Sequence, residues 1–385
     1  MRTRSTRAVL GIATLAGALL LAACSSSSGP GSSSTSGSPS TSGSTPASSS
    51  GADVAAAQAA IAPYVGQPSK FPIDTPLAKK PTGKRIAYLD CGTPICGLFS
   101  QLAQPAFKQL GMTLTTIKAG LKPDTVQAAF DTVVQDKYDG VFVPAIPPEL
   151  WTRGLQALKT AGIPIVTTGV VNADAYVKVQ QAGTVNSTNS GALMADWVVA
   201  KHGAASNVVL YYTPELAFQS VIKDSFLAEM TKVCSACTVR TVPISVTTFG
   251  TTAPNAVVSD LQAHPSTKTA VFGIGEQTPG LPAALKTAGI TIESVVNSPD
   301  PANLEEIKKG DFTVGLGLDL PVIAWTAADT LARQVTGADP APGAVADIPP
   351  QQFLGASDLQ FDVSHGWTAY PDFAKRFAAL WASAQ

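Results

Sequence analysis

The chain has 385 residues, of which 45% are hydrophobic and 14% are charged, and its formal net charge is -1. At roughly 100–200 residues per domain, this length predicts two domains with substantial cores. The charge argues against a nucleic-acid-binding protein, because there is no basic excess to neutralise phosphates. Three His and five Cys leave little material for a multi-metal enzyme, and we expect no metal site.

The first 23 residues have the pattern of an export signal. Arg2, Arg4 and Arg7 precede an uncharged, mostly apolar run over residues 8–23. This run is shorter than the ~20 residues of a stable membrane-spanning helix, so we expect a signal peptide that is cleaved. An uncleaved anchor and a plain secretory signal are the alternatives. The ending Leu21-Ala-Ala-Cys24 resembles a bacterial lipoprotein box, which implies that Cys24 is acylated and anchors the protein to the outer face of the cell membrane.

Residues 24–51 are expected to form a disordered tether behind the acylated cysteine. Residues 25–51 contain 15 Ser, 5 Gly, 3 Thr and 3 Pro. Such a segment lacks the apolar surface that would offset the entropy lost on ordering. As a flexible coil it would reach about 30 Å, which would hold a folded unit close to the membrane.

Strands and helices alternate from residue 84 onwards, after an N-terminal extension at 52–83 that we expect to pack along the first lobe. In the first half, the apolar runs predict strands at 85–90, 113–117, 140–144 and 163–167. Helices are expected between them, at 99–110 and around the apolar face formed by Val126, Ala129, Phe130 and Val133. Near-continuous apolar strands between helices predict a parallel sheet covered on both faces.

The second half repeats this pattern, with strands expected at 208–212, 239–243, 270–273 and 290–294. Residues 157–165 match residues 284–292 at every position except Pro164, which corresponds to Thr291. In both copies a helix ends at a glycine C-cap and leads into a strand. The repeat predicts two similar lobes; chance reuse of a stable helix–strand joint is the alternative. A final helix at 373–384 is expected to pack on the folded body.

Three stretches carry a resemblance to a known family. They are Asp139-Gly-Val-Phe-Val-Pro-Ala145, Ala161-Gly-Ile-Pro-Ile-Val-Thr167 and Leu261-Gln-Ala-His-Pro265, the last before the strand at 270–273. Over residues 84–360 the chain resembles the type I periplasmic binding proteins, in particular the sugar-binding, ribose-binding-protein-like branch that serves bacterial ABC importers. The resemblance implies an α/β fold of two doubly wound parallel-sheet lobes joined by a three-strand hinge.

The resemblance also implies where the lobes divide. Hinge crossings are expected near Asn186, near Asp319 and at 353–359. Lobe 1 would comprise residues 84–185 plus 320–350, and lobe 2 would comprise residues 187–318 plus 351–385.

Four cysteines besides Cys24 form two close pairs. In an exported protein we expect the disulfides Cys91–Cys96 and Cys234–Cys237. A redox role for Cys234-Ser-Ala-Cys237 is the alternative, but the motif follows a predicted helix, whereas a reactive thiol is favoured at a helix N-terminus. The pairs lie in different predicted lobes, which argues against a four-Cys zinc site.

Enzyme motifs are missing from the sequence. It contains no G-x-S-x-G elbow, no Walker loop and no H-E-x-x-H, and Gly273-Ile-Gly275 lacks the third glycine of a dinucleotide fingerprint. We therefore expect no catalysis and no cofactor. Acid–base catalysis by Glu276 or Asp319 is the remaining alternative.

Candidate ligand-binding residues follow from the position of the strands. Ligands bind beyond the carboxyl ends of parallel strands, so two facing lobes predict a cleft lined by the loops after each strand. Such a cleft needs apolar walls and a few polar groups. The candidates are Phe99, Thr168, Gly169, Asn186, Phe218, Gln219, Phe249, Glu276, Asn297 and Asp319. Core packing of the aromatic residues and solvation of the acids are the alternative interpretations.

Several positions depart from the sugar-binding pattern that the resemblance implies. Gly169 and Asn297 stand where that family commonly has Asp, Ile222 where it has Arg, Gly275-Glu276 where it has Asn-Asp, and Leu318 where it has Gln. Fewer polar partners then remain for ring hydroxyls, and each hydroxyl buried unpaired costs about 1–3 kcal/mol. These departures weaken the expectation of a standard monosaccharide ligand.

The sequence thus predicts an extracytoplasmic solute-binding lipoprotein, monomeric and without a nucleic-acid partner. It would capture a small ligand, a sugar or a sugar-like molecule or polyol, and deliver it to an ABC permease in the membrane. A ligand-sensing module for a membrane receptor, and binding of a less polar metabolite that is not a sugar, are the alternatives.

Overall fold

The computed structural model describes residues 52–68, 70–344 and 350–384. The predicted signal peptide, the acylated Cys24 and the tether lie outside the described residues. Within the described residues, no helix has both the length and the apolar character needed to cross a membrane.

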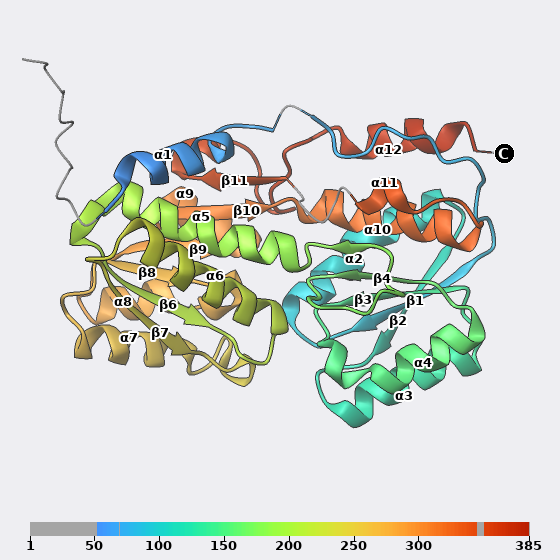
Figure 1. The fold of residues 1–385 in the computed structure, drawn as a ribbon, viewed down its shortest axis with the longest axis horizontal. Coiled ribbons are helices and arrows are strands. Elements are labelled where there is room, and N and C mark those ends of the chain that lie inside the picture. Colours follow the sequence, from blue (N-terminus) through green and yellow to red (C-terminus); the bar gives the residue numbers. More distant parts are fainter. Residues whose placement is uncertain (1–51, 69, 345–349, 385) are drawn as a thin grey trace, which may run out of the picture. The chain divides into compact units, whose positions relative to one another are not determined.

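The first sheet has five strands in the order β2-β1-β3-β4-β5, and adjacent strands are parallel. The strands are β1 (Arg85–Asp90), β2 (Thr113–Lys118), β3 (Gly140–Pro144), β4 (Ile165–Thr168) and β5 (Gln180–Gln181). Ile86 and Tyr88 of β1 pack with α2 (Pro94–Gln109) and α10 (Leu320–Val335), whereas Ala87 and Leu89 pack with α3 (Pro123–Gln135) and α4 (Thr152–Ala161). Helices therefore cover both faces of this sheet, which forms lobe 1 (Figure 1).

The second sheet has six strands in the order β11-β10-β9-β8-β6-β7, and only β11 is antiparallel to its neighbour. The strands are β6 (Asn207–Tyr212), β7 (Thr238–Pro243), β8 (Thr269–Phe272), β9 (Glu293–Asn297), β10 (Val314–Leu318) and β11 (Gln351–Leu354). Val208 and Leu210 pack with α5 (Thr184–His202) and α6 (Ala217–Val233). Val209 and Tyr211 face α7 (Ala253–Ala263), α8 (Leu281–Thr287) and α9 (Pro301–Lys309). This helix–sheet–helix unit forms lobe 2.

The structure confirms the predicted α/β fold with two parallel-sheet lobes, and two of the predicted elements have a bound that shifts by three residues or more. Helix α2 begins at Pro94 rather than at residue 99, because proline suits the first turn of a helix. The strand expected at 290–294 lies at Glu293–Asn297. Ile290 and Ile292 pack against the core from the loop before it, so their apolar character does not mark the strand. Short 3-10 turns lie at Ala62–Tyr64, Pro148–Leu150, Gly203–Ala205, Val246–Thr248, Gly275–Gln277 and Ala356–Asp358.

The chain passes between the sheets near two of the three predicted positions. It crosses after β5, close to Asn186, and after β10, at Asp319. A third connection joins α11 (Ala341–Ala344) to β11. It lies before the position predicted at 353–359, because β11 already belongs to the second sheet through its pairing with β10. Residues 345–349 of this connection lie outside the described residues.

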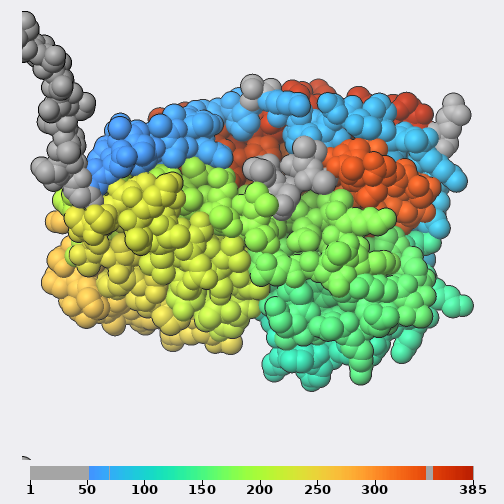
Figure 2. Space-filling model, in the orientation of Figure 1, coloured from blue at the N-terminus to red at the C-terminus, as the bar shows by residue number. Residues whose placement is uncertain are grey.

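The N-terminal extension packs on both lobes, not on lobe 1 alone. Helix α1 (Val54–Ile61) lies against α5 and α6, and the Asp53 N–H donates to Val233 O at 2.7 Å. Ile73 and Leu77 instead join the core of lobe 1. The extension, coloured blue, runs over the surface of both lobes in Figure 2.

The C-terminal helix α12 (Phe373–Ala382) also differs from prediction, because it packs on lobe 1 and not on lobe 2. Its Trp381 ring stacks on Trp325 of α10, with ring centroids 5.5 Å apart. The Leu77 N–H of the extension donates to Leu380 O at 2.9 Å. The apolar face of α12 thus closes over α10 and the extension together.

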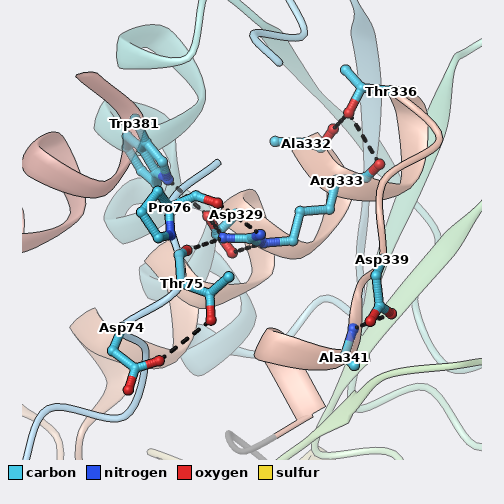
Figure 3. Close-up of polar contacts among 10 residues, drawn as sticks. All are labelled: Asp74, Thr75, Pro76, Asp329, Ala332, Arg333, Thr336, Asp339, Ala341 and Trp381. Carbon is cyan, nitrogen blue, oxygen red and sulfur yellow. Dashed lines mark hydrogen bonds and ion pairs between the residues drawn. The ribbon is translucent and has the colours of Figure 1, made fainter. Parts of the chain in front are cut away.

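A buried ion pair joins α10, the extension and α12 (Figure 3). Arg333 Nε donates to Asp329 Oδ2 at 2.7 Å, and the side chains are 4% and 0% exposed. The guanidinium also donates to Thr75 O at 2.6 Å and Pro76 O at 3.3 Å, and Trp381 Nε1 donates to Asp329 Oδ1 at 2.8 Å. Because each buried charge has several partners, the cluster holds both terminal segments on lobe 1.

Two disulfides are present, with the pairing that the sequence analysis expects. Cys91–Cys96 closes the loop from β1 into the first turn of α2, with Cα atoms 5.9 Å apart. Cys234–Cys237 lies just after α6, with Cα atoms 5.4 Å apart. The first of these disulfides shapes the loop that borders the space between the lobes.

Candidate ligand-binding site

A cavity lies between the lobes, at the carboxyl ends of strands from both sheets. Lobe 1 contributes the first turns of α2, with Phe99, and the ends of β3 and β4, with Gly169. Lobe 2 contributes α5, with Asn186, α6, with Phe218, and the end of β9, with Asn297. The cavity has a volume of about 70 Å³, which suits a small molecule.

The wall of this cavity is mostly apolar, and no charged side chain lies among the described residues that line it. Its polar members are Thr168, Asn186, Ser187, Ser190, Asn297 and Ser298. Its other members are Ile95, Cys96, Phe99, Pro144, Ala145, Gly169, Ala182, Phe218, Ile222, Ile274, Leu318, Leu320 and Ile323. An uncharged wall favours an uncharged ligand, because a charge moved there from water loses hydration that nothing replaces.

Two buried amides in the wall have an atom without a hydrogen-bond partner in the described structure. These atoms are Asn186 Nδ2 and Asn297 Oδ1, on residues that are 4% and 3% exposed. Asn297 is held by its own Nδ2, which donates to Gly273 O at 2.9 Å. The Ser187 and Ser190 hydroxyls, by contrast, donate to carbonyls one turn earlier in the chain. A ligand that pairs with the two amides would remove a penalty of about 1–3 kcal/mol for each.

Several residues that line the cavity have a left-handed backbone conformation. Ala145, Ala182 and Ser298 have φ angles of 50°, 48° and 48°, a region that residues other than glycine rarely adopt. Gly169 has a φ of 62° and faces them from the end of β4. Such conformations persist only where the surrounding structure holds them, and they concentrate at ligand sites.

Hydrogen bonding to Glu276 joins the two lobes beside the cavity. Glu276, which follows β8 in lobe 2, accepts from the Ile95 N–H in the first turn of α2 at 2.7 Å. The carboxyl group therefore caps α2 from the opposite lobe. Burial raises the pKa of Glu276 to about 7, with a smaller contribution from Asp300, while the Ile95 N–H and the Thr93 hydroxyl act in the other direction. The lobes are thus in contact, as in a closed binding protein.

The cavity brings together six of the ten predicted ligand-binding residues, which are Phe99, Thr168, Gly169, Asn186, Phe218 and Asn297. Their contact with a ligand stays a prediction. Three of the others lie behind or beside the wall. Gln219 is buried and its Nε2 donates to Gly273 O at 2.8 Å, Phe249 packs against the core, and Glu276 makes the bond between the lobes.

Asp319 points away from the cavity. Its carboxylate caps α10, accepting from the Val322 N–H at 3.1 Å, and also accepts from the Thr368 hydroxyl and the Ala369 N–H, both at 2.9 Å. Burial raises the pKa of Asp319 to about 7, against these three hydrogen bonds. The group fixes the segment before α12 to the hinge, which accounts for an acid at this crossing.

Sequence reasoning missed Ser187 and Ser190 of α5 and most of the apolar wall. Asn186 and Ser190 are four residues apart on α5 and share a face, so helical spacing could have identified Ser190. Ile274, Leu320 and Ile323 carry no such signal, because an apolar residue has the same pattern whether it faces a core or a cavity.

Two parallel-sheet lobes that enclose a cavity at their strand ends define a bilobal binding protein. Residues 93–339 match the periplasmic binding protein domain family, and the chain belongs to this family. Membership implies a binding role outside the cytoplasm. No curated protein matches the chain.

Solved structures share the fold at low sequence identity. An ABC transporter solute-binding protein from Actinobacillus succinogenes with bound D-allose is 18% identical, with a TM-score of 0.61 over 72% of this chain and 99% of that one. A 5-methylthioribose transporter solute-binding protein from Thermotoga lettingae, in complex with 5-methylthioribose, is 15% identical, with a TM-score of 0.63 over 78% and 99% of the two chains. The arabinose-binding component of an ABC transporter from a Shewanella species is 15% identical, with a TM-score of 0.62 over 77% and 98%.

Proposed function

We propose that the protein is an exported, lipid-anchored solute-binding protein that delivers a small neutral molecule to an ABC-type importer. A sugar, a sugar-like molecule or a polyol is the ligand class. The observation that carries this proposal is the cavity between the lobes, whose described lining has no charged side chain and includes two buried amides that each have an unpaired atom. The ligands bound by proteins of the same fold, such as D-allose and 5-methylthioribose, support a neutral solute.

Closure of the lobes is the proposed mechanism of capture. A ligand in the cavity would contact Phe99 of lobe 1 together with Phe218 and Asn297 of lobe 2. Because these contacts form together only when the lobes are closed, ligand binding shifts the population towards the closed state. The closed pair of lobes is then the form that the permease would recognise.

Anchoring through Cys24 is the second part of the proposal. The lipoprotein-like Leu21-Ala-Ala-Cys24 and the Ser-rich segment behind it support an acylated cysteine on a tether. The full chain, expressed in a bacterium with a labelled fatty acid, should incorporate label and sediment with membranes. The variant Cys24→Ala should lose both properties, and a label that remains on this variant would contradict the assignment.

A thermal-shift screen of sugars, polyols, nucleosides and small aromatic molecules tests ligand capture. A true ligand should raise the melting temperature and reduce the radius of gyration in small-angle scattering, and it should be recovered unchanged. Asn255 lies in α7 and is exposed, so Asn255→Leu is the control. This variant should show the same ligand-induced changes in melting temperature and radius of gyration as the wild type. The proposal would be overturned if none of the neutral solutes stabilised the protein, or if the protein converted the ligand into a product.

A further inference from the structure

The cavity has little capacity for hydrogen bonding. The Asn186 Nδ2 amino group offers two unpaired N–H donors, and Asn297 Oδ1 offers one unpaired acceptor. The Ser187 hydroxyl is used within α5, and the Ser190 hydroxyl donates to Asn186 O and accepts from Gln351 Nε2 at 2.8 Å. The free polar groups are therefore few and lie mainly on two side chains.

A polyhydroxylated ligand needs more than this. Each sugar hydroxyl is both a donor and an acceptor, and one that is buried unpaired weakens binding. Besides the two amides, the hydroxyls of Thr168 and Ser298 are the polar side-chain groups of the described wall that make no hydrogen bond. A pentose or hexose in this cavity would leave several of its hydroxyls without partners.

Apolar side chains enclose the remaining space from both lobes. Ile95 and Phe99 approach from lobe 1, and Phe218, Ile222 and Ile274 approach from lobe 2. Contact with such surfaces makes binding more favourable when it removes carbon and hydrogen atoms of the ligand from water, and not when it removes hydroxyl groups. The wall thus matches an apolar body.

Charged ligands are disfavoured as well. Glu276 and Asp319 do not line the cavity, and each accepts a hydrogen bond from at least one backbone N–H group. Among the described lining residues there is no Lys or Arg that could pair with an anion. An ionised group would therefore enter the cavity without a partner.

We infer that the ligand is an uncharged molecule with an apolar body that presents at least one acceptor to Asn186 and one donor to Asn297. Cyclic amides, hydroxyketones and sugars with deoxygenated or alkylated positions have this chemistry. The inference rests on the proposed capture of a neutral solute, and it replaces free sugars and polyols as the ligand class with less polar neutral molecules.

Three probes of similar size test it by calorimetric titration of the folded chain. ε-Caprolactam has a neighbouring acceptor and donor on an apolar ring, D-xylose is polyhydroxylated, and 6-aminohexanoate is the charged, ring-opened form of the lactam. We expect ε-caprolactam to bind at least about tenfold more tightly than D-xylose, and 6-aminohexanoate not to bind. Asn186→Leu should weaken ε-caprolactam binding by about tenfold or more, whereas Asn255→Leu should not change it.

The outcomes separate this inference from the proposed function. Tighter binding of D-xylose overturns the inference and leaves solute capture standing. The inference is also overturned if the folded Asn186→Leu variant binds ε-caprolactam as tightly as the wild type does. If the leucine variant does not fold, Asn186→Ala gives the same test, because it removes the amide without filling space. If ε-caprolactam does not bind, the inference is overturned. The proposed function is overturned as well only if the wider solute screen also finds no ligand.

Discussion

The substitution Glu276→Gln tests the cap that lobe 2 places on α2. Glutamine keeps the size of the side chain and an oxygen that can accept from the Ile95 N–H, but it cannot ionise. The wild-type carboxyl is 4% exposed, and burial raises its pKa from 4.5 to about 7. The variant therefore removes one titration and leaves the contact between the lobes in place.

The sign of the effect follows from proton binding. The folded protein holds the Glu276 proton more tightly than the unfolded chain, so the folded state binds more protons between pH 4.5 and about 7. Wild-type stability from this group is greatest at low pH and declines as the pH rises through that window. At ~1.4 kcal/mol for each unit of pKa difference, the decline is up to about 3 kcal/mol.

Urea unfolding at pH values from about 5 to 8 measures this effect as the difference between variant and wild type. Asp196 and Asp319, whose pKa values burial also raises to about 7, titrate in both proteins and cancel in the difference. We expect Glu276→Gln to gain stability relative to wild type as the pH rises, by up to about 3 kcal/mol. A difference that does not change with pH, or that changes in the opposite direction, would refute the reasoning, because the carboxylate would then be stabilised by the N-terminus of α2.

Two further substitutions probe the packing that positions the cavity. Arg333→Met leaves the buried Asp329 carboxylate without an opposite charge, although the Trp381 N–H still donates to it, and should cost about 3–5 kcal/mol of unfolding free energy in urea. The double variant with Asp329→Leu should recover part of this loss, and no recovery would contradict the argument. Gly191→Ala places a Cβ 2.3 Å from Ile222 O and should cost about 1–3 kcal/mol by forcing α5 and α6 apart. Gly97→Ala, in α2 with nothing within 4 Å of its Cβ, is the matched control and should be neutral or stabilising, so equal losses in the two variants would count against the steric explanation.

The sequence alone was enough to predict the alternation of strands and helices and the two-lobed parallel sheets. Buried parallel strands such as 140–144 and 208–212 are apolar at almost every position, and this property is local. The positions just after the strands also indicated where a ligand would lie, because the carboxyl ends of parallel strands meet at one edge. Asn297 could be identified in this way, whereas Asn186 was expected at a hinge crossing that the family resemblance implies.

Only the tertiary structure decided which surfaces these elements meet. The apolar face of α12 is visible in the sequence, but its packing on lobe 1 depends on Trp325 and on the buried ion pair of α10. Glu276 lies in a loop after a strand, yet it caps a helix of the other lobe. The apolar character of the cavity likewise depends on side chains from both lobes. Contacts between residues far apart in the chain leave no local pattern, and these contacts set the charge, the size and the hydrogen-bonding capacity of the site.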